Sequence, residues 1–99
     1  MKVIYDPRVD KIIRGLPEKH NSRVVGVVDL FIDGGFNLSA LYLKKLKSQI
    51  WELRAGRYRL LFGTNGPNAV ITNIFLKKTQ RTPNLEIKLA VQRLKQYEK

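Results

Sequence analysis

The stretch Ile50-Trp-Glu-Leu-Arg-Ala-Gly-Arg-Tyr-Arg-Leu-Leu-Phe-Gly-Thr64 contains two apolar runs separated by a short turn signal. Apolar and polar residues alternate over Ile50–Arg54, and Ala55-Gly56 is typical of a tight turn. Tyr58–Thr64 then has the composition of a returning strand. The stretch therefore predicts an antiparallel β-hairpin.

Two more elements are predicted on the C-terminal side of this hairpin. A turn at Asn65-Gly-Pro-Asn68 leads into Ala69–Phe75, whose strand composition predicts a three-stranded antiparallel meander. Thr82 can cap a final helix with Pro83 at its first helical position. The apolar stripe of that helix would be formed by Ile87, Ala90, Val91, Leu94 and Tyr97.

Two helices are predicted before the hairpin. After a strand-like run, Val3–Tyr5, Asp6 can serve as the N-cap of the first helix, with Pro7 at its first position. Its core-facing residues would be Val9, Ile12, Ile13 and Leu16. The second helix starts near Pro17 and ends at Gly34-Gly35. Its core-facing residues would be Val24, Val27, Val28 and Phe31.

The second helix has one alternative, which affects the topology. β-branched Val is a modest helix former, so Val24–Ile32 could also form a strand. Phe36–Leu46 is expected to be an irregular approach to the first long strand. With two helices, the element order is β-α-α-β-β-β-α, and residues 1–99 form a single α+β domain. An N-terminal strand and a helical hairpin would pack on a small antiparallel sheet, with a helix at the C-terminus.

The chain is strongly basic, with 19 Lys and Arg against 8 Asp and Glu and a net charge of +11. Such a balance favours a polyanionic partner. The segment Lys44–Arg59 alone holds six cationic side chains and one carboxylate. No apolar run approaches the roughly 20 residues needed to span a bilayer, and no signal peptide pattern is present. The sequence therefore predicts a cytoplasmic protein with no membrane partner.

Strand alternation should bring several cations together. Arg54, Arg57 and Arg59 are expected on one face of the hairpin, with Tyr58 packed on the opposite, core side. Neighbouring arginines repel one another unless an anion compensates, which favours a polyanion site over an ordinary charged face. Glu52 is expected to be an ion-pair partner that orients these arginines, in preference to an acid or a base.

Such a cluster is suited to cleaving RNA. Attack by the 2′-hydroxyl requires charge stabilisation at the phosphate and movement of two protons. Arginine offers a planar fork for phosphate oxygens, and the Lys77-Lys78 pair can supply a base or an acid when neighbouring cations favour loss of a proton. His20 is expected to be solvated. With one histidine, no cysteine and scattered carboxylates, the sequence predicts neither a metal site nor a cofactor.

In their order and spacing, four segments resemble the phage-derived HigB-type branch of the RelE/ParE toxin superfamily. The segments are Trp51–Arg54, Arg57–Phe62, Phe75–Lys78 and Arg81–Pro83, and an Ala-containing helix follows them. The resemblance implies a RelE-like, microbial RNase-like fold. It also implies the toxin of a type II toxin–antitoxin system, a ribosome-dependent, metal-independent mRNA endoribonuclease that cuts in the ribosomal A site. The cognate partner would be a HigA-like antitoxin with a helix-turn-helix domain.

The resemblance also implies roles for cationic residues. The implied catalytic residues are Arg54, Arg59, Lys77, Lys78 and Arg81. Arg59 matches the strand arginine that stabilises the cleaved phosphate. The expected RNA contacts are Lys44, Lys45 and Lys47, together with Arg57 from the hairpin. The C-terminal tyrosine of RelE-type catalysis has no equivalent here, so the general base stays unassigned.

Two other functions remain open. A ParE-like toxin acting on DNA gyrase would need a partner surface and no convergent phosphate site, so the arginines and lysines above favour the nuclease. A non-catalytic RNA- or ribosome-binding module would need only the basic sheet. A transcriptional regulator is disfavoured, because no predicted helix carries base-reading side chains.

Overall fold

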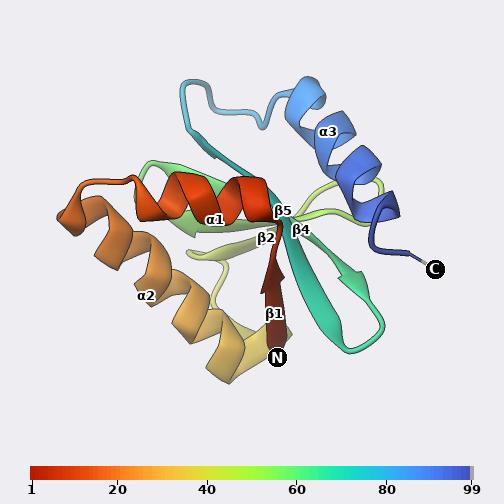
Figure 1. Cartoon of the computed structure of the whole chain (residues 1–99), viewed down its shortest axis with the longest axis horizontal. Helices are drawn as coiled ribbons and strands as arrows, with labels where there is room; N and C mark the ends of the chain where they lie inside the picture. Colours follow the sequence, from red (N-terminus) through yellow and green to blue (C-terminus); the bar gives the residue numbers. More distant parts are fainter. Residues whose placement is uncertain (99) are drawn as a thin grey trace.

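The computed structural model describes residues 1–98 and confirms the α+β class. A five-stranded sheet has two helices on one face and a third helix on the other (Figure 1). The strands are β1 (Lys2–Tyr5), β2 (Leu43–Lys45), β3 (Trp51–Ala55), β4 (Tyr58–Asn65) and β5 (Asn68–Leu76). The helices are α1 (Pro7–Arg14), α2 (Glu18–Gly34) and α3 (Asn84–Lys95), with a short 3-10 turn at Gly35–Asn37.

The sheet is larger than the predicted meander. Its strand order is β1-β5-β4-β3-β2, so the antiparallel meander β3-β4-β5 lies at the centre, as expected. β1 adds to β5 in the parallel direction, which makes the sheet mixed. β2 pairs antiparallel with β3, although this part of the chain was expected to be irregular. Three residues are too few for an alternating pattern to stand out, and exposed lysines are common on such short edge strands.

The two N-terminal helices form as predicted, and the strand alternative for α2 is wrong. The Asp6 side chain accepts a hydrogen bond from the Arg8 backbone N–H at 2.9 Å, and Pro7 begins α1. On α1 only Val9 and Ile13 are buried, whereas Ile12 is 48% exposed. The reason is geometric, because successive residues turn by about 100° around a helix and this short helix contacts the sheet along one narrow line.

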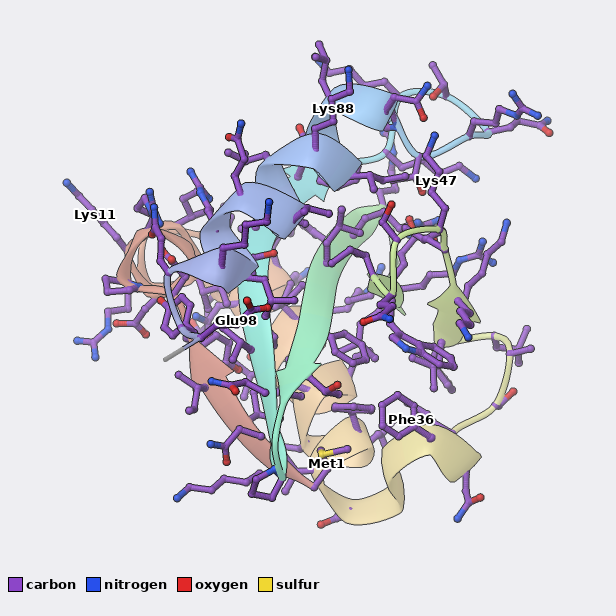
Figure 2. All side chains as sticks on the ribbon, turned by 90° about the vertical axis from the view of Figure 1, so that its right-hand side faces the viewer. Met1, Lys11, Phe36, Lys47, Lys88 and Glu98 are labelled. Carbon is purple, nitrogen blue, oxygen red and sulfur yellow. The ribbon has the colours of Figure 1, made fainter. Side chains whose placement is uncertain are left out.

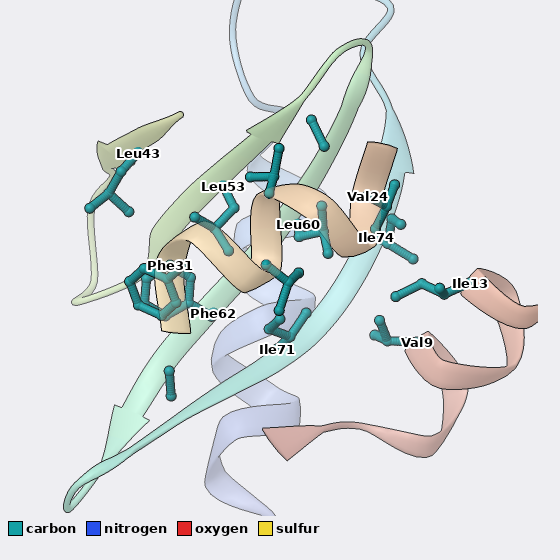
Figure 3. Close-up of a cluster of buried hydrophobic side chains, with 14 residues drawn as sticks. Val9, Ile13, Val24, Phe31, Leu43, Leu53, Leu60, Phe62, Ile71 and Ile74 are labelled. Atoms are coloured by element: carbon teal, nitrogen blue, oxygen red, sulfur yellow. The ribbon is translucent and has the colours of Figure 1, made fainter. Parts of the chain in front are cut away.

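The main core lies between α1, α2 and one face of the sheet (Figure 3). There Phe31 of α2 packs against Phe62 of β4, with ring centroids 4.8 Å apart. A second cluster lies on the opposite face, where Ile87 and Ala90 of α3 contact Leu61. α3 therefore covers the central strands β4 and β5. No helix within residues 1–98 is long and apolar enough to cross a membrane.

Two predictions about the ends of α3 are wrong. Thr82 does not cap the helix, because α3 starts at Asn84 with Pro83 in the N-cap position and without a side-chain cap. Tyr97 lies beyond the end of α3 and does not extend its apolar stripe. Its hydroxyl donates a hydrogen bond to the Asp6 carboxylate at 2.9 Å, which fastens the C-terminal segment to the start of α1.

Candidate functional site

A hollow of about 560 Å³ opens on the α3 side of the sheet, beside the start of that helix. Strands β3 and β4 form its floor, and the segment between β5 and α3 forms its wall. All five cations implied to be catalytic line it, namely Arg54, Arg59, Lys77, Lys78 and Arg81. Two carboxylates, those of Glu52 and Glu86, also line the hollow, so it keeps an excess of positive charge.

Cross-strand pairing places the two strand arginines together. Arg54 of β3 is directly opposite Arg59 of β4, so both side chains lie on the same face of the sheet. Arg57 does not line the main hollow, because β4 begins one residue later and Arg57 sits in the hairpin turn after Gly56, whose φ is +62°. Tyr58 is half-buried against the main core, as predicted.

A buried carboxylate lies beneath these arginines. The Glu52 side chain is only 3% exposed, and its Oε2 is 3.3 Å from Arg54 Nε. Its Oε1 is 4.0 Å from Arg59 Nε and accepts a hydrogen bond from the Thr82 hydroxyl at 2.6 Å. These contacts confirm the expected ion pair. They also offset the desolvation that a buried charge would otherwise suffer.

The guanidinium of Arg59 is held more firmly than that of Arg54. Its Nη1 donates to the carbonyl oxygens of Gly56 and Tyr58, at 2.8 and 3.0 Å. Burial lowers the pKa of Arg59, Glu52 opposes that change, and the nearby Arg54 adds to it. Within residues 1–98 no hydrogen bond involves Nη2 of Arg59, so this nitrogen can donate to a bound anion.

The remaining cations of the site come from exposed chain after β5. Lys77, Lys78 and Arg81 are exposed, in contrast to the two strand arginines. A second hollow of about 450 Å³ adjoins the first and shares Arg59, Lys77 and Lys78 with it. Arg57 lines this second hollow, so it lies close to the site without entering the main hollow.

The lysines expected to contact RNA do not form one surface. Lys44 pairs with Glu52 across β2 and β3 and shares its face, whereas Lys45 points to the other face. There the Lys45 ammonium lies 5.7 Å from the Trp51 ring centroid. Lys47 lines a third hollow near α3 together with Lys88 (Figure 2). Contacts between these lysines and RNA stay a prediction.

Two side chains have partners that the sequence did not indicate. His20, expected to be solvated, is exposed, but its Nδ1 is 2.7 Å from the Tyr58 hydroxyl. Thr82 belongs to the site through Glu52. Both contacts join residues at least 30 positions apart, and no local pattern reports such a distance. Within residues 1–98, no three His, Cys, Asp or Glu side chains group as they would around a metal ion.

Solved structures of RelE toxins share this fold. The archaeal RelE–RelB complex from Pyrococcus horikoshii OT3 has a TM-score of 0.62 at 17% identity, covering 78% of this chain and 94% of that chain. The isolated RelE toxin from E. coli has a TM-score of 0.58 at 14% identity, covering 94% and 97%. The RelB–RelE complex from Methanococcus jannaschii has a TM-score of 0.56 at 18% identity, covering 74% and 88%. The similarity confirms the expected RelE-like fold.

At the level of sequence, the chain is similar to a known protein family. No curated protein sequence matches the chain significantly. The family model described as "Phage derived protein Gp49-like (DUF891)" matches residues 11–95, a range that includes every residue lining the main hollow. The chain therefore belongs to the Gp49-like family of phage-derived proteins.

Proposed function

We propose that this protein is the toxin of a type II toxin–antitoxin system, of the HigB type, and that it is an mRNA endoribonuclease acting on the translating ribosome. The observation that carries the proposal is the gathering of Arg54, Arg59 and three further cations around one hollow. The RelE-like fold supports it, since the fold neighbours above are RelE toxins.

The arrangement fits phosphoryl transfer by side chains alone. The 2′-oxygen would lose its proton to a base and form a bond to phosphorus, while the bond from phosphorus to the 5′-oxygen breaks and that oxygen takes up a proton. Arg59 and Arg54 would stabilise the charge that develops on the phosphate oxygens. Lys77 and Lys78, on the wall of the hollow, are the candidates for moving the two protons.

The proposal includes a protein partner and a location. Two of the fold neighbours were solved as complexes of RelE with RelB, which supports an antitoxin as the partner here. We propose a HigA-like antitoxin with a helix-turn-helix domain. With a net charge of +11, the toxin would be captured fastest by an acidic surface. Messenger RNA and the ribosome would be its targets, in the cytoplasm.

The decisive experiment compares Arg59→Ala with the wild type in a ribosome-programmed mRNA cleavage assay with mapped ends. Loss of one donor to a developing oxyanion costs about 10²–10³ in rate, so cleavage and growth arrest should both disappear. Arg14→Ala is the matched control, because Arg14 is 79% exposed on α1 and pairs with Asp10 outside the hollow. Lys78→Ala removes an exposed cation of the site, so it should slow mRNA cleavage without disturbing the fold.

The outcomes separate the three functions. A ParE-like toxin would inhibit DNA supercoiling by gyrase and leave mRNA intact. A non-catalytic module would bind ribosomes and produce no new RNA ends, and Arg59→Ala would reduce binding and toxicity in proportion. If Arg59→Ala remained toxic, or if the wild type produced no cut ends, the endoribonuclease proposal would be refuted.

A further inference from the structure

The segment 77–82 connects β5 to α3 and is fastened to the sheet at both ends; we name it the basic strap. At its start, the Lys77 backbone N–H donates to the Arg57 carbonyl at 2.7 Å. At its end, the Thr82 hydroxyl donates to the Glu52 carboxylate at 2.6 Å. In Figure 1 the strap is the pale blue loop that extends away from β5 and returns to the start of α3.

The Thr82 hydroxyl forms its hydrogen bond with a residue of the sheet and not with helix α3. Its position before Pro83 is typical of a helix cap, yet α3 has no side-chain cap, and the hydroxyl is directed to Glu52. Because the Glu52 carboxylate is buried and pairs with Arg54, this is a charge-assisted hydrogen bond to a group with little exposed surface.

The same bond bears on the position of Arg59. Glu52 Oε1, which accepts from Thr82, is also the oxygen nearest Arg59, with 4.0 Å to Arg59 Nε. Without the hydroxyl, that oxygen would be free to draw the Arg59 guanidinium into a closer ion pair. Such a pair would compete directly with a phosphate for the same donors.

We propose that Thr82 is a positioning residue, which holds the basic strap over the strand arginines and keeps Arg59 available for a phosphate. The inference rests on the proposed function, since it concerns the same hollow. Lys77, Lys78 and Arg81 reach the hollow from the strap, whereas Arg54 and Arg59 reach it from the sheet. The Thr82–Glu52 bond joins the two groups, and catalysis of this kind depends on their relative placement.

The test uses three variants of the full chain. Thr82→Val keeps the size of the side chain and removes the hydroxyl, whereas Thr82→Ser keeps the hydroxyl. Thr64→Val is the matched control, because Thr64 is an exposed threonine towards the far end of β4. Two quantities are measured: the rate of trypsin cleavage within the strap, mapped by mass spectrometry, and the rate constant of mRNA cleavage on saturating programmed ribosomes.

We expect Thr82→Val to be nicked within the strap about tenfold faster than the wild type and to cleave mRNA about tenfold more slowly, the scale of one hydrogen bond to a charged group. Thr82→Ser should restore both rates, and Thr64→Val should change neither. Unchanged nicking in Thr82→Val, or a Thr82→Ser variant that behaves like it, would overturn the inference. So would faster nicking with an unchanged cleavage rate constant.

The two proposals fail in different ways. If the wild type cleaved no mRNA, the proposed function would fall, while the trypsin comparison would still decide whether the strap is tethered through Thr82. If the wild type cleaved mRNA and the Thr82 variants matched it in both measurements, the function would stand and the positioning role would be lost.

Discussion

Replacing the buried carboxylate at the floor of the hollow should cost the protein stability and increase its response to anions. Glu52→Gln keeps the shape of the side chain and an oxygen for the Thr82 hydroxyl, but it removes the negative charge between two arginines. Arg54 lies 3.3 Å and Arg59 4.0 Å from that charge. Their mutual repulsion is then uncompensated at the floor of the hollow, where Arg59 is largely buried and Arg54 partly so.

The magnitude follows from the exposure of the three side chains. Breaking a buried ion pair costs about 3–5 kcal/mol. The Arg59 side chain is 11% exposed, but that of Arg54 is 32% exposed, so water screens part of the repulsion. We therefore expect a loss of about 2–3 kcal/mol. For a domain of this size that lowers the melting temperature by roughly 10–20 °C.

The assay is thermal and urea unfolding of the Glu52→Gln variant, with and without sulfate at matched ionic strength. Sulfate should raise the melting temperature of the variant more than that of the wild type, because an anion replaces the missing carboxylate. Glu98→Gln makes the same change of charge at an exposed position and should alter stability by less than about 0.5 kcal/mol. A Glu52→Gln protein as stable as the wild type, and equally sensitive to sulfate, would refute the reasoning.

Three further predictions concern the scaffold. The Arg8 guanidinium holds the pKa of the Asp6 carboxyl well below its usual range. The ionised Asp6 therefore stabilises the fold above about pH 4, and this contribution is lost as the pH falls through the lower pKa of the folded state. Asp6→Asn should flatten the pH dependence of urea unfolding over that range, and an unchanged profile would contradict this prediction. Gly63→Ala should lower the free energy of unfolding by about 1 kcal/mol, because the added methyl group meets the Leu94 side chain. By contrast, Gly26→Ala, in open space on α2, should stabilise the protein by up to about 1 kcal/mol. Thermal melts of both glycine variants beside the wild type show whether each substitution raises or lowers the stability.

Much of the fold could be predicted from local patterns. The first helix was located by Asp6 and Pro7, which act on their immediate neighbours, and the hairpin by the turn at Gly56 between two alternating runs. The strand β2 was missed, because Leu43–Lys45 is too short to carry a periodic signal. The parallel pairing of β1 with β5 joins residues more than 60 positions apart, and no local pattern reports it.

The features of the candidate site also divide into those that local patterns predict and those that depend on tertiary contacts. Alternation by itself placed Arg54 and Arg59 on one face, because the side chains of paired strands repeat with a period of two. Arg57 precedes β4 and lines only the adjoining hollow, together with Arg59, because its position depends on where the turn ends. For Thr82 the local signal pointed to a helix cap, but the tertiary fold offered a buried carboxylate, and the hydroxyl bonds to that stronger acceptor.

The amino-acid sequence thus determined the class of the fold, the hairpin and the excess of positive charge, since each depends on residues within a few positions of one another. Only the tertiary structure decided that the charge surrounds one hollow, that Glu52 lies buried beneath it, and that the basic strap forms its wall and bonds to Glu52 through Thr82. These features depend on how β3, β4 and the start of α3 meet in space, and burial then fixes which polar groups must find a partner.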